Sequence, residues 1–175
     1  LHVSPLGAVG MFLLGGVFSA QFGMSAVYGS EIGLSTVEIS GFVAMFFIGP
    51  MIFQFPLGWL SDRMDRRILI LAASVITAGG AMIGIAFSNN FTLLLVAAFL
   101  IGGMTNPLYS LVLAHTNDFL SHDDMASAAG GMVFINGLGA IGGPMLAAWA
   151  MGVIGPQGYF VFIAILMIML VGYAA

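Results

Sequence analysis

Six apolar stretches, each about as long as a bilayer is thick, constrain the fold of this chain more than any other feature of its sequence. Hydrocarbon offers no partners for free backbone polar groups, so a segment that crosses a membrane must form a helix or close into a barrel. The alternation of apolar and polar residues that is typical of a barrel strand is absent from these stretches. The sequence therefore predicts an all-α membrane protein, a single six-helix domain over residues 1–175 with transmembrane helices at about 5–28, 39–59, 68–87, 91–114, 125–151 and 159–175.

The composition excludes several classes of protein. Hydrophobic residues make up 61% of the chain and charged residues only 6%, whereas soluble domains carry roughly 25% charged residues. A soluble enzyme, a disordered chain and a coiled coil are therefore excluded, and the formal net charge of -4 excludes a nucleic-acid binder. The sequence has no cysteine, so a disulfide framework and a thiolate metal site are excluded as well. We expect no cofactor and no metal.

All of the cationic side chains lie in one loop, between the second and third predicted helices. They are Arg63, Arg66 and Arg67, and the sequence has no lysine. Short loops rich in arginine or lysine stay on the cytoplasmic side of a membrane. We therefore expect this loop to be cytoplasmic and, after six crossings, both ends of the segment as well, with the bacterial inner membrane as the expected location.

The same loop carries the most specific motif of the chain. The run Gly58–Arg67 reads G-W-L-S-D-R-M-D-R-R and resembles the loop signature of the major facilitator superfamily, G-x-L-x-D-R-x-G-R-R. In that family the signature joins the second and third helices of each six-helix half, which is also its place here. The sequence departs from the signature at Asp65, where the family prefers glycine, and a non-glycine residue in a left-handed turn carries a steric cost.

The resemblance implies a cytoplasmic gating loop formed by Gly58, Asp62, Arg63, Arg66 and Arg67. In the family this cluster is thought to latch helices at the cytoplasmic face and to bias inward-facing against outward-facing states. From the residues alone, Asp62 can pair with Arg63 or Arg66, or lie against the N-terminus of a neighbouring helix, where anions are favoured. The alternative is a topology anchor without a gating role.

The resemblance also implies that the chain is one half of a transporter. Family members have about twelve helices in two six-helix halves, each built from two three-helix inverted repeats. The first residue is not methionine, no charged linker follows the sixth helix, and residues 54–58 with Leu108 and Tyr109 look like the second half of YcaD-like bacterial members. We therefore expect the second half. Its expected partners are the other six-helix half, on the same or a partner chain, the lipid bilayer and an unknown small solute.

The fifth predicted helix is rich in glycine. Gly139 and Gly143 form a G-x-x-x-G step, and Pro144 follows directly. Small residues let helix backbones approach closely in a bilayer, and proline bends a helix. We expect Gly139, Gly143 and Pro144 to pack against another helix. A mechanistic hinge, which the similar Gly-Pro motif of antiporters in the family would imply, is the alternative.

A few polar side chains lie within the predicted spans, where they are costly and usually face the bundle interior or a water-filled cavity. In the superfamily the first and fourth helices of each half line the central cavity, so the resemblance implies substrate contact for polar residues on those helices. Interhelical hydrogen bonding is the alternative for each of them. The candidate cavity residues are Gln21, Tyr28, Asn106, Tyr109, Ser110 and, on the fifth helix, Asn136.

No charged residue lies in the middle of a predicted span, so this segment offers no carrier for proton coupling. At the cytoplasmic end of the fourth helix, His115, Asp118 and His122 have the spacing of one helix face. Such a set could hold a divalent ion, but we interpret it as a solvated helix end. A hydrolase triad of Ser110, His115 and Asp118 would lack oxyanion donors, and we expect no enzyme.

Two functions from different classes fit these features. The first is half of a secondary transporter that moves a small solute by alternating access. The alternative is a non-transporting integral membrane subunit or assembly factor that keeps the fold. A polar cavity beside Gln21, Asn106 and Tyr109 would favour the transporter, and dry packing of these side chains against a partner's helices would favour the subunit.

Overall fold

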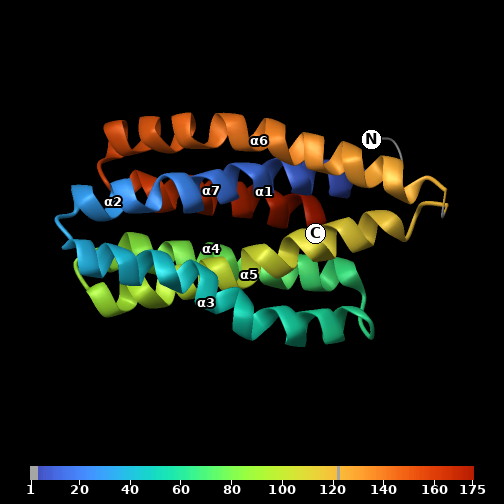
Figure 1. Ribbon diagram of the computed structural model, residues 1–175, viewed down its shortest axis with the longest axis horizontal. Helices are drawn as coiled ribbons and strands as arrows, with labels where there is room; N and C mark the ends of the chain where they lie inside the picture. Colours follow the sequence, from blue (N-terminus) through green and yellow to red (C-terminus); the bar gives the residue numbers. More distant parts are fainter. Residues whose placement is uncertain (1–3, 122) are drawn as a thin grey trace.

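The computed structural model describes residues 4–121 and 123–175, which form seven α-helices and no strand (Figure 1). The all-α fold is thereby confirmed. Five of these helices are long and apolar enough to cross a membrane, and α7 is apolar but shorter. The helices are α1 (Pro5–Gly23), α2 (Ser25–Glu31), α3 (Thr36–Ser61), α4 (Arg66–Ala86), α5 (Phe91–Asn117), α6 (Met125–Ile154) and α7 (Gly158–Ala174).

The first predicted helix, 5–28, is divided in the structure into α1 and α2. The division lies at Met24, whose backbone (φ -114°, ψ -9°) departs from ordinary helical geometry. Hydrogen bonds nevertheless cross it, because the Met24 N–H donates to the Ala20 carbonyl and the Tyr28 N–H donates to the Met24 carbonyl, both at 2.9 Å. α2 therefore extends α1 along the bundle (Figure 1) and does not begin a separate layer.

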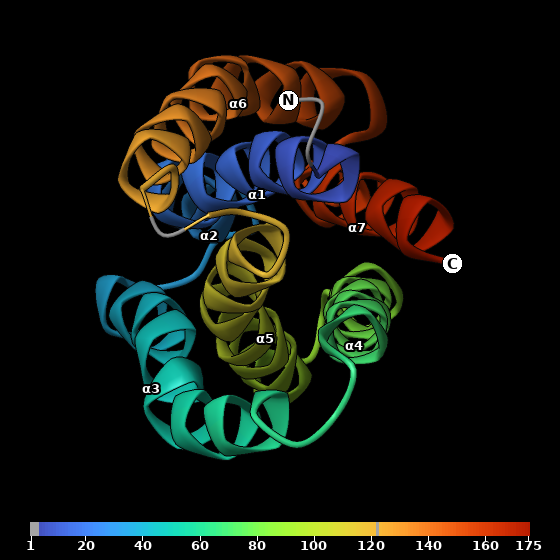
Figure 2. The same cartoon turned by 90° about the vertical axis from the view of Figure 1, so that its right-hand side faces the viewer.

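The helices form a bundle in which α1 and α5 lie in the middle (Figure 2). α6 packs beside α1, and α3 packs beside α5. On one side of the bundle α4 and α7 pack against each other and cover α5 and α1. On the opposite side, between α3 and α6, no helix of the described residues covers α1 and α5.

Glycine sets the contact between α1 and α6. A Cβ atom at Gly139 would overlap the carbonyl oxygen of Phe12, and one at Gly15 would overlap the carbonyl oxygen of Asn136. Gly143 lies equally close to Ser19, and Pro144 lies beside Gly23 at the end of α1. The two backbones are thus in direct contact, which only small residues permit.

A second glycine contact joins α3 to α5. A Cβ atom at Gly49 would overlap the carbonyl oxygen of Phe99, and one at Gly102 would overlap the carbonyl oxygen of Phe46. Gly103 lies beside Gly49 in the same crossing. The two long pairs of the bundle, α1 with α6 and α3 with α5, are therefore built in the same way.

Large apolar side chains remain exposed on α3 and α6. Soluble proteins rarely expose contiguous apolar surface of this extent, so lipid or another protein surface must cover it. The most exposed include Met51 and Phe55 on α3 and Ile141, Met145 and Trp149 on α6.

The α1–α6 contact predicts that Gly139→Ala destabilises the protein, by about 1–3 kcal/mol, because the added methyl group meets backbone that cannot move aside. The matched control is Gly137→Ala on the same helix, since a Cβ atom at Gly137 has no atom within 4 Å. It should leave the melting temperature unchanged or raise it, because alanine favours the helix. Thermal unfolding of the purified full protein measures both variants. Equal melting temperatures for the two would refute the close contact.

Candidate functional site

A pocket opens midway along the bundle between α1, α3 and α5. Its volume is about 410 Å³. Three of the residues expected to line a cavity, Asn106, Tyr109 and Ser110, form its α5 wall. The other lining residues are Phe18 and Phe22 on α1 and Gln54 on α3.

Neutral polar groups and aromatic rings share this pocket. Gln54 Nε2 donates to Ser110 Oγ at 3.3 Å, which links α3 to α5. Asn106 Nδ2 donates to the Gly102 carbonyl of its own helix at 3.2 Å. The rings of Phe18 and Tyr109 lie 6.0 Å apart, centroid to centroid, and so join α1 to α5 across the pocket floor.

The remaining three candidate cavity residues lie elsewhere, in contacts between helices. Gln21 is fully buried, and its Oε1 accepts a hydrogen bond from Thr105 Oγ1 on α5 at 3.0 Å. Asn136 Nδ2 donates to the Met11 carbonyl at 3.0 Å, within the α1–α6 contact. Tyr28 is buried in an aromatic cluster with Tyr159 and with Phe42 and Phe160. Gln21 and Tyr28 lie on either side of the division at Met24, and both are buried away from the pocket.

A second pocket of about 280 Å³ adjoins the first. Gln54 and Ser110 line both pockets, so their hydrogen bond lies on the boundary between them. The second pocket extends toward the arginine loop, where Gly58, Asp62 and Arg66 complete its wall. The two pockets together form a polar path from the middle of the bundle to the end at which α3 meets α4.

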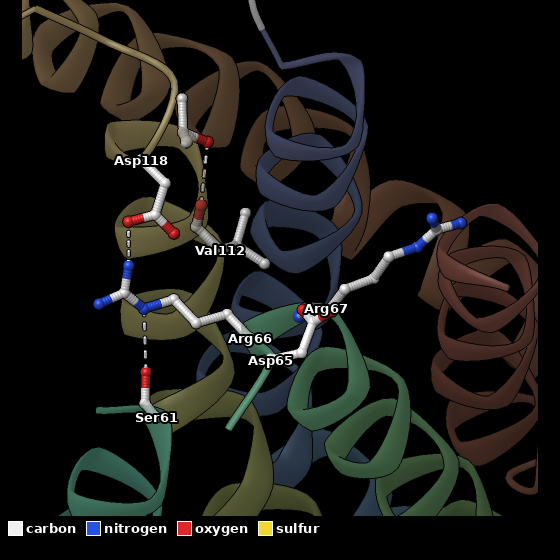
Figure 3. A network of polar contacts seen from close by, with 7 residues as sticks. Ser61, Asp65, Arg66, Arg67, Val112 and Asp118 are labelled. Atoms are coloured by element: carbon white, nitrogen blue, oxygen red, sulfur yellow. Dashed lines mark hydrogen bonds and ion pairs between the residues drawn. The ribbon is translucent and has the colours of Figure 1, made fainter. Parts of the chain in front are cut away.

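The arginine loop fastens several helices at that end. Arg66 forms an ion pair with Asp118 at the end of α5, and its Nε donates to Ser61 Oγ at 3.2 Å (Figure 3). Arg67 points away from Arg66, as Figure 3 shows, and its Nε donates to the Ala174 carbonyl of α7 at 2.7 Å. One loop thereby holds the ends of α3, α5 and α7.

The third arginine turns back along α3. The Arg63 guanidinium lies 3.9 Å from the centre of the Trp59 ring, and its Nη1 donates to the Trp59 carbonyl at 3.3 Å. For Asp62 the sequence left open a pair with Arg63 or Arg66 or a place against a helix N-terminus, and in the structure Asp62 has no ion pair with either arginine. Arg66 pairs with Asp118 instead, because the end of α5 places the Asp118 carboxylate beside the loop.

Asp65 replaces the family's glycine without strain. Its backbone (φ -59°, ψ 119°) is not left-handed, so the steric cost considered above does not arise. The Asp65 carboxylate accepts a hydrogen bond from the Arg67 N–H at 2.8 Å and caps the N-terminus of α4. Aspartate is among the preferred residues at this position.

The end of α5 does not assemble a metal centre from the residues that the structure describes. The His115 ring packs edge-on against Phe119, with centroids 5.2 Å apart. Asp118 is occupied by Arg66, and His122 lies outside the described residues. Across residues 4–121 and 123–175, no group of three histidine, aspartate or glutamate side chains could hold a metal ion.

Sequence reasoning missed the aromatic part of the pocket. Phe18 and Phe22 are four residues apart and share a helix face, but in a chain this rich in apolar residues nothing distinguishes them from phenylalanines that face lipid. Gln54 carries a clearer signal, since an amide within a predicted span is costly unless it faces a polar partner.

Comparison with known proteins identifies relatives over nearly the whole chain. The family model "Major Facilitator Superfamily" matches residues 7–175. An uncharacterized MFS-type transporter of Bacillus subtilis, YfkF, is 29% identical over 84% of this chain and 37% of its own length. Another, YcaD of Escherichia fergusonii, is 23% identical over 94% of this chain and 42% of its own. The chain thus spans about two-fifths of the length of these relatives.

A solved structure has the same fold. It is described as an auto-inhibited POT family peptide transporter, and it superposes with a TM-score of 0.81 at 19% sequence identity. The match covers 96% of this chain and 35% of that one.

The cap on α4 predicts the order of stability of variants at Asp65. Asp65→Asn should retain the hydrogen bond, Asp65→Gly should lose a few tenths of a kcal/mol, and Asp65→Ala should lose about 1 kcal/mol. Thermal unfolding of the full protein measures the order. If Asp65→Gly proved more stable than the natural protein, the residue would occupy the left-handed turn of the family signature and the assigned cap would be wrong.

Proposed function

We propose, because this chain belongs to the Major Facilitator Superfamily, that it forms one six-helix half of a secondary transporter that moves a small solute by alternating access. The chain is an integral membrane protein, and its family is one of transporters rather than enzymes. In this proposal α1 and α2 together make the first span, and α3 to α7 make the other five.

The lengths of the relatives support the proposal that this chain forms one half of a transporter. The chain matches only 35–42% of YfkF, YcaD and the solved transporter, which leaves room in those proteins for a second bundle.

The helix pairing supports two inverted repeats. If the first three spans correspond to the last three, α1 corresponds to α5 and α3 corresponds to α6. The α1–α6 pair is then equivalent to the α5–α3 pair, and in both pairs the helices cross at glycine. Residues 54–58 with Leu108 and Tyr109 favour the second half.

The surface of the bundle indicates where the proposed other six-helix half would pack. α3 and α6 flank the side of the bundle that no described helix covers, and both carry large exposed apolar side chains. The pocket of Asn106, Tyr109 and Ser110 lies between α1, α3 and α5. A second bundle on this side would cover the flanks and close the pocket into a central cavity. Arginine enrichment of the loop supports a cytoplasmic position for it, and the bacterial relatives favour the inner membrane.

One observation carries the proposal: a pocket lined by neutral polar and aromatic side chains lies midway along the bundle, while Gln21 and Asn136 form hydrogen bonds between helices. Solute sites at the bilayer midplane are the arrangement that alternating access requires. The residues proposed to contact the solute are Asn106, Tyr109, Ser110 and Gln54. Gln21, Tyr28 and Asn136 are proposed to position the helices that carry them.

The arginine loop is proposed as the cytoplasmic gate. Arg66 and Asp118 tie the α3–α4 loop to the end of α5, directly beside the smaller pocket through which a solute would reach the cytoplasm. Their side chains are 26% and 47% exposed. An ion pair this exposed contributes about 0–1 kcal/mol, which is enough to bias two states and too little to lock one. Gly58, Asp62, Arg63 and Arg67 shape and anchor the same loop.

Alternating access predicts that position 106 meets water from both sides of the membrane. The test is Asn106→Cys in a cysteine-free background of the full protein, treated with a membrane-impermeant thiol reagent in right-side-out and inside-out vesicles. We expect labelling in both. Ala97→Cys, on the same helix but fully buried, should be labelled in neither. Protection of Asn106→Cys in both vesicle types would reject the central cavity and favour the non-transporting subunit.

The proposed gate predicts that Asp118→Asn shifts this labelling toward the cytoplasmic side, by up to about fivefold, because the lost ion pair contributes about 1 kcal/mol or less. The melting temperature should change little. Asp123→Asn is the matched control, since it removes an exposed carboxylate from the neighbouring α5–α6 loop but leaves the ion pair in place. An equal shift in both variants would assign the effect to loop charge in general and not to the Arg66–Asp118 pair.

A further inference from the structure

We propose, resting on the transport function above, that the central pocket binds an uncharged aromatic ring of the solute that carries an N–H or O–H donor. The pocket is the one formed by Phe18, Phe22, Gln54, Asn106, Tyr109 and Ser110. Its volume of about 410 Å³ lies within the range of pockets that bury small ligands. The proposal concerns the part of the solute that this bundle contacts.

The charge of the pocket excludes an ionised group. None of the residues that line it is charged, and within the described ranges the arginines are engaged at the loop with Asp118, Ala174 and Trp59. An ion that leaves water for a site without a counter-charge pays a large desolvation cost. The group bound here is therefore neutral.

The aromatic side chains favour a flat ring. Phe18 stands between Phe22 and Tyr109, with centroid distances of 5.9 and 6.0 Å. Phe22 is held in turn by Phe47 of α3 at 5.3 Å, so the aromatic wall has support behind it. Aromatic pairs prefer stacked or edge-to-face contacts at 4.5–7 Å, and a ring of the solute can extend this series.

The polar groups can accept a donor on that ring. One N–H of Asn106 Nδ2 donates to the Gly102 carbonyl, and one N–H of Gln54 Nε2 donates to Ser110 Oγ. These bonds leave the amide oxygens of Asn106 and Gln54 as acceptors, and the hydroxyls of Ser110 and Tyr109 can donate or accept. A ring that carries an N–H or O–H donor therefore meets acceptors on both α3 and α5.

The distribution of these groups argues against a polyol such as a sugar. A polyol carries hydroxyl groups around its whole ring, and each needs a partner when it leaves water. The α1 side of the pocket consists of Phe18 and Phe22, whose side chains offer no donor or acceptor. An aromatic heterocycle with one N–H matches this division, with its ring against α1 and its donor toward α3 and α5.

Three small probes test the proposal on the purified full protein in lipid nanodiscs, with binding measured by equilibrium dialysis. They are indole-3-carboxamide, the near-isosteric anion indole-3-carboxylate, and glucose. We expect the carboxamide to bind at least about tenfold more tightly than the carboxylate, and glucose to give no saturable binding. Equal or tighter binding of the carboxylate, or saturable binding of glucose, would overturn the proposal.

Variants locate the binding. Asn106→Leu removes one acceptor at similar volume and should weaken carboxamide binding about fivefold to tenfold. Phe22→Ala should weaken it about tenfold. Phe87→Ala, an exposed phenylalanine at the end of α4 outside this pocket, is the control and should have no effect. If the carboxamide binds but neither pocket variant weakens it, the site is elsewhere and the proposal fails.

The proposed function and the proposed ligand fail separately. Labelling of Asn106→Cys from both sides, together with binding of the carboxylate or glucose, would retain the transporter and reject the uncharged aromatic ring. Protection of that cysteine from both sides, together with binding of the carboxamide that depends on Phe22 and Asn106, would retain the pocket and reject alternating access. Absence of saturable carboxamide binding overturns the ligand class whatever the labelling shows.

Discussion

Two close contacts, in each of which glycines meet the backbone of a neighbouring helix, hold this bundle together. In a bilayer, lipid is as apolar as a leucine side chain, so helices gain little by burying apolar surface and associate through close packing and polar bonds. Gly139 against Phe12 and Gly49 against Phe99 provide such packing. The pocket depends on both, because α1 is fixed to α6, α5 is fixed to α3, and the pocket is formed where these pairs meet.

The polar bonds of the interior act between the two pairs. Thr105 on α5 donates to Gln21 on α1, and both residues are fully buried. Such bonds contribute about 0.6 kcal/mol on average in membrane bundles. Their main effect is on geometry: the bond between Gln21 and Thr105 sets the rotation of α5, and therefore the direction of Asn106 beside it.

The helices and the family could be predicted from the sequence, but most of the candidate site could not. Apolar length predicts membrane spans because hydrocarbon permits so few backbone conformations. The division at Met24 follows no such rule, and Gln21 and Tyr28, which lie on either side of it, are buried between helices and do not line the pocket. The partner of Arg66 lies 52 residues away, so only the packing of α5 decides between Asp62 and Asp118. Phe18 and Phe22 could not be predicted as pocket residues for a different reason, since lipid-facing and pocket-facing phenylalanines have the same sequence signal.

The hydrogen bond between Gln54 and Ser110 has a consequence for timing. It is weak, joins two neutral and exposed side chains, and marks the boundary of the two pockets. Side chains of this kind change rotamer in picoseconds to nanoseconds, whereas bundles rock in microseconds to milliseconds. A solute on the proposed path would meet this hydrogen bond open many times during one movement of the helices. The rate of its passage would then be set by the motion of whole bundles and by the ion pair that biases it, and the Gln54–Ser110 contact would select solutes by shape without controlling when they pass.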